Sequence, residues 1–153
     1  RINYHGINTY VAKVSGKDLS SNDFTTAYKN KLDGIIIATG SEVEMALEIA
    51  QELFLIGIDI RVVSMPSVEL FLKQNPKYES QLLPKEIPTF VIELGSSIIW
   101  NRFATKPEYI FGVNRFGMSG KPSEVVKYLK MDKGYILETI GNYLTKDNII
   151  DII

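Results

Sequence analysis

Three serines stand in short loops after apolar runs, where a nucleophile could meet a bound substrate. They are Ser41, Ser96 and Ser119. A serine needs a base to activate it, and the only histidine, His5, is far from all three in sequence. We therefore expect no Ser-His-Asp triad and interpret His5 as a solvated or packing residue. No catalytic residue is predicted in this chain.

Metal and thiol chemistry have equally little support. The chain has no cysteine and one histidine, and no acidic cluster has the spacing of metal ligands. Structural zinc sites use cysteine and histidine, and calcium and magnesium sites need several oxygen ligands. The sequence therefore predicts no metal-binding residue.

Residues 117–122, Gly-Met-Ser-Gly-Lys-Pro, look at first like a phosphate-binding Walker loop. That motif needs a glycine where Arg115 stands and a serine or threonine where Pro122 stands. No Gly-x-Gly-x-x-Gly follows a predicted strand either, so a dinucleotide site has no support. We therefore reject both motifs and predict no cofactor-binding residue.

The loop before the first predicted helix is the remaining candidate, because a helix amino end can bind an anion. Ser41 and Glu44 form a capping-box pattern that would occupy two of the free amides. Glu42 and Glu44 also place negative charge where the anion would sit. A simply capped helix is the preferred interpretation, with the anion site kept as the alternative. The residues of this candidate anion site are Gly40, Ser41, Arg115 and Ser119.

Glu93 ends a predicted buried strand, so its carboxylate needs hydrogen-bond partners or a raised pKa. A general acid or base at this position is one reading. A carboxylate satisfied by structural hydrogen bonds is the preferred one.

Composition narrows the class of protein. The chain has 153 residues, 45% of them hydrophobic and 23% charged, which suits one ordinary globular domain. The formal net charge is -1, so we expect neither nucleic acid nor an anionic membrane as a partner. No apolar run approaches the roughly 18 residues of a membrane span. Because the chain begins at Arg1 and not at methionine, we expect that a preceding part is missing.

Apolar runs bounded by glycine or proline predict buried strands at 35–39, 58–65, 89–94 and 109–113. Helical spacing predicts a helix that begins at Ser41 and stops at Gly57, and another over 68–73. Further helices are expected around Trp100, after Pro122 and over 136–144, while three prolines interrupt the long connection over 74–88.

This alternation predicts an α/β three-layer sandwich with a mostly parallel sheet, whose ligands would lie at the carboxyl ends of the strands. Residues 1–33 are polar and irregular, apart from an alternating stretch at 9–14 that could form an edge strand. We therefore divide the chain into an N-terminal linker over 1–33 and a regular domain over 34–153.

Several motifs of the domain resemble the C-terminal domain of transketolases. The opening run at 35–43 reads Ile-Ile-Ile-Ala-Thr-Gly-Ser-Glu-Val, and 57–67 reads Gly-Ile-Asp-Ile-Arg-Val-Val-Ser-Met-Pro-Ser. Glu-Leu-Phe follows at 69–71, Leu-Pro at 83–84, Val-Ile-Glu-Leu-Gly at 91–95 and Arg-Phe-Gly-Met-Ser at 115–119. Trp100 falls where the family has a tryptophan, and Leu94 replaces a small residue of the family pattern. The resemblance covers about 110 residues, from Gly34 to Leu144.

The resemblance implies about five strands, mostly parallel, with one antiparallel edge strand. It implies a cytoplasmic parent enzyme of the pentose phosphate pathway that transfers a two-carbon ketol unit between sugar phosphates. Such enzymes use thiamine diphosphate and a divalent metal, Mg²⁺ or Ca²⁺, held between the two preceding domains of a homodimer. None of the motifs of those domains is present here. We therefore expect the N-terminal and middle domains as partners and a structural, non-catalytic role for this domain.

Two alternatives stay open. The parent could be another thiamine enzyme, although the run Ser-Met-Pro-Ser at 64–67 favours transketolase over the Pro-Leu-Asp usual in those relatives. The domain could also be a free-standing regulatory module that binds a small anion at the strand ends.

Overall fold

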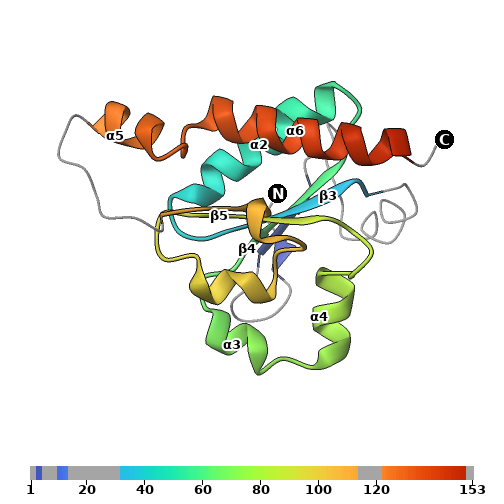
Figure 1. Ribbon diagram of the computed structural model, residues 1–153. Helices are drawn as coiled ribbons and strands as arrows, with labels where there is room; N and C mark the ends of the chain where they lie inside the picture. Colours follow the sequence, from blue (N-terminus) through green and yellow to red (C-terminus); the bar gives the residue numbers. More distant parts are fainter. Residues whose placement is uncertain (1–2, 5–9, 14–31, 114–121, 151–153) are drawn as a thin grey trace.

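A six-stranded sheet in the order β1-β2-β4-β3-β5-β6 forms the middle layer of the computed structural model, which describes residues 3–4, 10–13, 32–113 and 122–150. Four strands are parallel: β3 (Gly34–Ala38), β4 (Ile60–Ser64), β5 (Thr89–Glu93) and β6 (Ile110–Gly112). Both faces carry helices (Figure 1). The predicted α/β sandwich is therefore confirmed.

The antiparallel strand predicted over 9–14 is β2 (Tyr10–Lys13), which pairs with β4. It is not the outermost strand. β1 (Asn3–Tyr4) pairs antiparallel along its other side, so the sheet has six strands and not about five. A two-residue strand carries too little alternation to be predicted from sequence.

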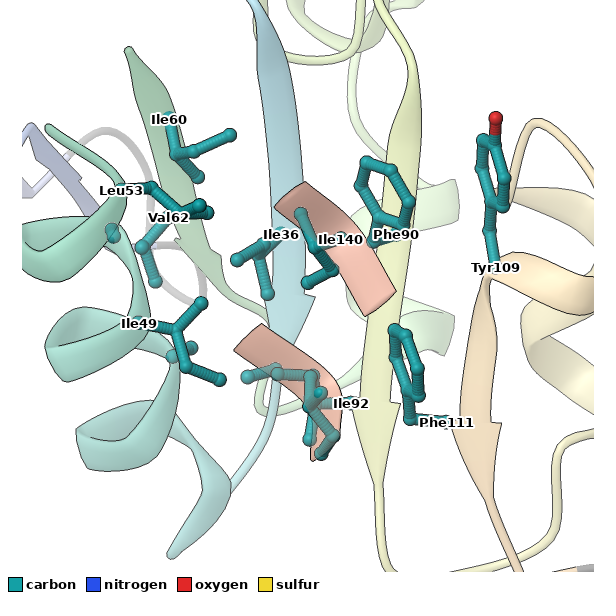
Figure 2. Packing of buried hydrophobic residues seen from close by; sticks show 14 of the residues in the cluster. Ile36, Ile49, Leu53, Ile60, Val62, Phe90, Ile92, Tyr109, Phe111 and Ile140 are labelled. Atoms are coloured by element: carbon teal, nitrogen blue, oxygen red, sulfur yellow. The ribbon is translucent and has the colours of Figure 1, made fainter. Parts of the chain in front are cut away.

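One face of the sheet is covered by the long helices α2 (Glu42–Leu55) and α6 (Lys133–Ile150). Because side chains alternate along a strand, Ile36 and Ala38 of β3 point to this face and Ile35 and Ile37 to the other. Figure 2 shows strand residues such as Ile36 and Phe90 packed together with Ile140 of α6 in this first core.

The opposite face carries shorter elements (Figure 1). They are α3 (Val68–Leu72), α4 (Pro76–Leu82) and the 3-10 helix η1 (Ile98–Arg102). The second 3-10 helix, η2 (Pro107–Tyr109), leads into β6, and its Tyr109 packs in the first core, where its ring stacks on Phe90. A second core over this face contains Ile35, Ile37, Phe71, Trp100 and Phe103. The helix predicted around Trp100 is thus a single 3-10 segment.

Helix α4 was not predicted, because the three prolines between residues 74 and 88 indicated an interrupted connection. Pro76 is the first residue of α4, where proline's missing amide would have had no partner inside the helix. Asn75 caps the helix by accepting a hydrogen bond from the Lys77 amide at 2.8 Å. The helix therefore begins at Pro76, one of the prolines expected to interrupt this connection.

For helix α2, the predicted C-terminal end agrees with the structure and the predicted N-terminal cap does not. Gly57 has a φ of +87° and ends the helix in a Schellman arrangement, in which the Ile58 amide donates to the Leu53 carbonyl. The predicted capping box is wrong. Ser41 lies in the helical region of backbone space and its side chain makes no cap hydrogen bond.

The last helices are α5 (Pro122–Tyr128) and α6. The ammonium of Lys133 binds the carboxylates of Glu52 at 2.9 Å and Glu48 at 3.0 Å, joining the start of α6 to α2. The hydrogen bonds that Lys133 donates to Glu52 and then to Glu48 raise the pKa of Lys133 above its ordinary value. Among the described residues, no helix is both long and apolar enough to cross a membrane.

Candidate functional site

The carboxyl edge of the parallel strands brings the ends of β3 and β5 together. The Thr39 hydroxyl donates to Oε2 of Glu93 at 2.8 Å, and the Gly95 amide donates to Oε1 of the same carboxylate, also at 2.8 Å. Both oxygens of Glu93 are therefore hydrogen-bonded within the fold. The hydrogen bonds expected of a structural carboxylate are therefore present, and these partners lock the loop after β5 to the loop after β3.

The start of α2 is the described half of the candidate anion site. The Ser41 hydroxyl donates to Oε1 of Glu42 at 2.6 Å, and Glu42 is a buried residue. The Glu42 amide donates to the Thr39 carbonyl, and the Val43 amide to the Gly40 carbonyl. An incoming anion would meet engaged amides and a carboxylate at this point, so the geometry adds nothing in favour of binding.

The other half of that site, Arg115 and Ser119, lies within 114–121, outside the described residues. His5 lies outside them as well. The anion hypothesis is therefore still a prediction, and so is the interpretation of the histidine.

Ser96 has a structural use. Its hydroxyl accepts a hydrogen bond from the Ile98 amide at 3.4 Å, at the start of η1. Over the described ranges, no group of three His, Cys, Asp or Glu residues could hold a metal ion. The described part of the carboxyl edge thus offers hydrogen bonds that fix its own loops, and no set of groups aimed at a ligand.

Arg61 was not singled out from the sequence, although it is a charged residue in a buried strand and is only 4% exposed. Its Nη1 donates to the carbonyls of Gln81 at 3.1 Å and Leu82 at 2.5 Å. These carbonyls lie at the end of α4, where the helix has no amides to satisfy them. Arg61 therefore anchors α4 to the sheet. The signal that could have found it is the lone cation inside the apolar run of β4.

A groove of about 770 Å³ opens at the opposite edge of the sheet, between α4, the loop before β5 and the end of η1. Its lining carries both signs of charge, from Glu79 and Glu86 and from Lys85 and Arg102. The Arg102 guanidinium lies 5.9 Å from the ring centre of Phe103. No residue of the predicted sites lines this groove.

Comparison with known proteins gives a consistent family. The model of the transketolase-like C-terminal domain matches residues 23–132. The transketolase of Scheffersomyces stipitis is 35% identical over 132 residues, which is 84% of this chain and 19% of that protein. The transketolase of Bacillus subtilis is 40% identical over 95 residues, or 61% of this chain and 14% of that protein.

Solved structures of transketolases have a similar fold to this chain. The crystal structure of transketolase from Campylobacter jejuni matches with a TM-score of 0.69 and 29% identity, over 87% of this chain and 18% of that chain. The chain thus spans between about one seventh and one fifth of the length of these relatives.

Proposed function

The chain belongs to the transketolase-like C-terminal domain family, and from this premise we propose that it is the structural, non-catalytic C-terminal domain of a transketolase. The parent enzyme transfers a two-carbon ketol unit from a ketose phosphate to an aldose phosphate in the cytoplasmic pentose phosphate pathway. The N-terminal and middle domains of a homodimer supply the groups that bind thiamine diphosphate and its Mg²⁺ or Ca²⁺ ion. Residues 34–153 form the family domain, and residues 1–33 are the linker to the preceding domain. This linker also contributes strands β1 and β2 to the sheet.

One observation carries the non-catalytic part of this proposal. At the described carboxyl edge, where α/β sheets place their ligands, the polar groups bind one another. Thr39 and Gly95 both donate to Glu93, and Ser41 donates to Glu42. A diphosphate or a metal ion needs donors or carboxylates that are free to turn toward it. The described residues do not fit the cofactor, and we assign no step of the reaction to them.

The test uses the isolated chain. We expect no ketol transfer between xylulose 5-phosphate and ribose 5-phosphate, and no heat of binding when thiamine diphosphate is titrated with Mg²⁺ or Ca²⁺. The full-length transketolase of Scheffersomyces stipitis is the positive control. Micromolar cofactor affinity of the isolated chain, or measurable transfer by it, would overturn the proposal.

The anion hypothesis is tested separately, with inorganic phosphate as the probe. Phosphate binding that is lost in Arg115→Ala would support a site formed by Gly40, Ser41, Arg115 and Ser119. Unchanged affinity in that variant would remove Arg115 from it.

A further inference from the structure

Three large aliphatic side chains after β5 are exposed to solvent. Leu94, Ile98 and Ile99 have exposed fractions of 46%, 77% and 56%. They lie within residues 94–101, Leu-Gly-Ser-Ser-Ile-Ile-Trp-Asn, a run without one charged residue in a chain that is 23% charged. Exposed apolar residues that cluster in this way mark interaction surfaces in soluble proteins.

The backbone under these side chains is held firmly on both sides. Before the run, Glu93 accepts hydrogen bonds from Thr39 and Gly95. After it, Trp100 is 2% exposed and Phe103 8%, and the Phe103 ring packs edge-on against Phe71 of α3 at 5.7 Å. The inward side of η1 is thus fixed in the second core, while its two isoleucines face outward. A surface that is already ordered loses little conformational entropy when a partner covers it.

We propose that Leu94, Ile98 and Ile99 form the surface on which the preceding transketolase domains dock. This inference rests on the proposed function, because it names the partner surface that the structural role requires. The interior of a permanent interface is apolar and poor in charge, and this run has that composition.

A second copy of this chain is a poorer occupant. Three aliphatic residues with these exposed fractions present roughly 300 Å², the size of the largest apolar patch on an ordinary monomer. A stable dimer needs about 800 Å² from each partner. A domain joined through the polypeptide chain needs less, because the linkage supplies a high effective concentration. The small size of the surface therefore fits a tethered partner.

The end of α2 carries a second exposed apolar group, with Leu55 at 84% and Ile56 at 69%. Charged residues flank both groups, Glu52 and Asp59 here and Glu93 and Arg102 around the run at 94–101. Glu93 is held by Thr39 and Gly95, and Arg102 lines the groove at the opposite edge of the sheet, whereas Glu52 is exposed in its pair with Lys133. Charge is depleted at the centre of protein interfaces, which favours the run at 94–101. The α2 end serves instead as a matched control surface.

The experiment compares amide hydrogen exchange in the isolated chain with that in a chimaera. In the chimaera, this chain replaces the matching part of the Scheffersomyces stipitis transketolase, to which it is 35% identical. We expect amides of residues 94–101 to exchange about tenfold more slowly in the chimaera, a factor equal to 1.4 kcal/mol. The variant Ile98→Asp/Ile99→Asp should lose this protection. The control variant Leu55→Asp/Ile56→Asp should keep it.

Three outcomes would overturn the docking surface: no added protection at 94–101, added protection only around Leu55, or concentration-dependent protection of the isolated chain, which indicates a second copy. Ketol transfer is measured on the same chimaera and reports on the proposed function alone. An active chimaera without protection at 94–101 refutes the docking surface and leaves the proposed function standing. An inactive chimaera that is protected at 94–101 refutes the proposed function and leaves the docking surface standing.

Discussion

Replacing Thr39 by valine should weaken the link between the loops after β3 and β5. The substitution keeps the branched shape and removes the hydroxyl that donates to Oε2 of Glu93 at 2.8 Å. A hydrogen bond to a charged group stabilises a fold by about 1.5–3 kcal/mol when it is buried. Both side chains here are half-buried, so water replaces part of the bond, and we expect a loss of about 1 kcal/mol.

Urea unfolding followed by circular dichroism measures this loss. With an m-value of about 2 kcal/mol per M, the midpoint should fall by about 0.5 M. A double-mutant cycle with Glu93→Ala isolates the pair, and its coupling energy should be about 1 kcal/mol. Thr145→Val is the matched control, because the Thr145 hydroxyl donates to the Gly141 carbonyl of its own helix, in an exposed position. That control should leave the midpoint nearly unchanged.

Additive losses, to within about 0.3 kcal/mol, would show that the two side chains do not stabilise each other. An equal loss in Thr145→Val would show that the hydroxyl at 39 has no special role. Either result would refute the reasoning that Glu93 is a structural carboxylate held by Thr39.

Three further predictions concern the rest of the fold. Gly57→Ala should cost about 1 kcal/mol in urea unfolding, because a side chain is strained at a φ of +87° although no atom lies near it. Ile36→Ala should cost about 2–5 kcal/mol by the same measurement, because Ile36 is fully buried in the first core. Lys133→Met should lower the thermal midpoint slightly, and added salt should reduce the difference, because the pairs with Glu48 and Glu52 are exposed. The contribution of the Lys133 charge should be complete below its ordinary pKa of 10.5 and disappear as pH rises through the higher folded-state value, so a constant difference across that range would contradict the pairing.

The parallel strands could be predicted because their signal is local. A short run of isoleucine between glycines, as at 34–40, suits a strand buried on both faces whatever its neighbours are. Gly57 was predictable for a similar reason, since a left-handed helix stop favours the residue without a Cβ atom. The family motifs also lie in these segments, so fold class and family followed from the chain itself.

The errors have physical causes. Asn75-Pro76 was read as an interruption because proline both ends helices and begins them. Ser41 and Glu44 have the spacing of a capping box, but the Ser41 hydroxyl donates to the neighbouring Glu42 carboxylate instead. Choices between nearby partners depend on small differences in geometry that residue spacing does not contain.

The sequence by itself determined which segments of this protein are buried, which residue ends α2, and that the loop serines Ser41, Ser96 and Ser119 are far in sequence from the histidine at position 5. Only the tertiary structure decided which groups form hydrogen bonds with the buried polar side chains. Glu93 needed partners, yet the Thr39 hydroxyl comes from 54 residues away, and Arg61 is buried because the carbonyls at the end of α4 reach it. It also decided that Ile98 and Ile99 face solvent while Trp100 beside them is buried. Burial of an apolar residue depends on which elements pack over it, and that is a property of the folded chain.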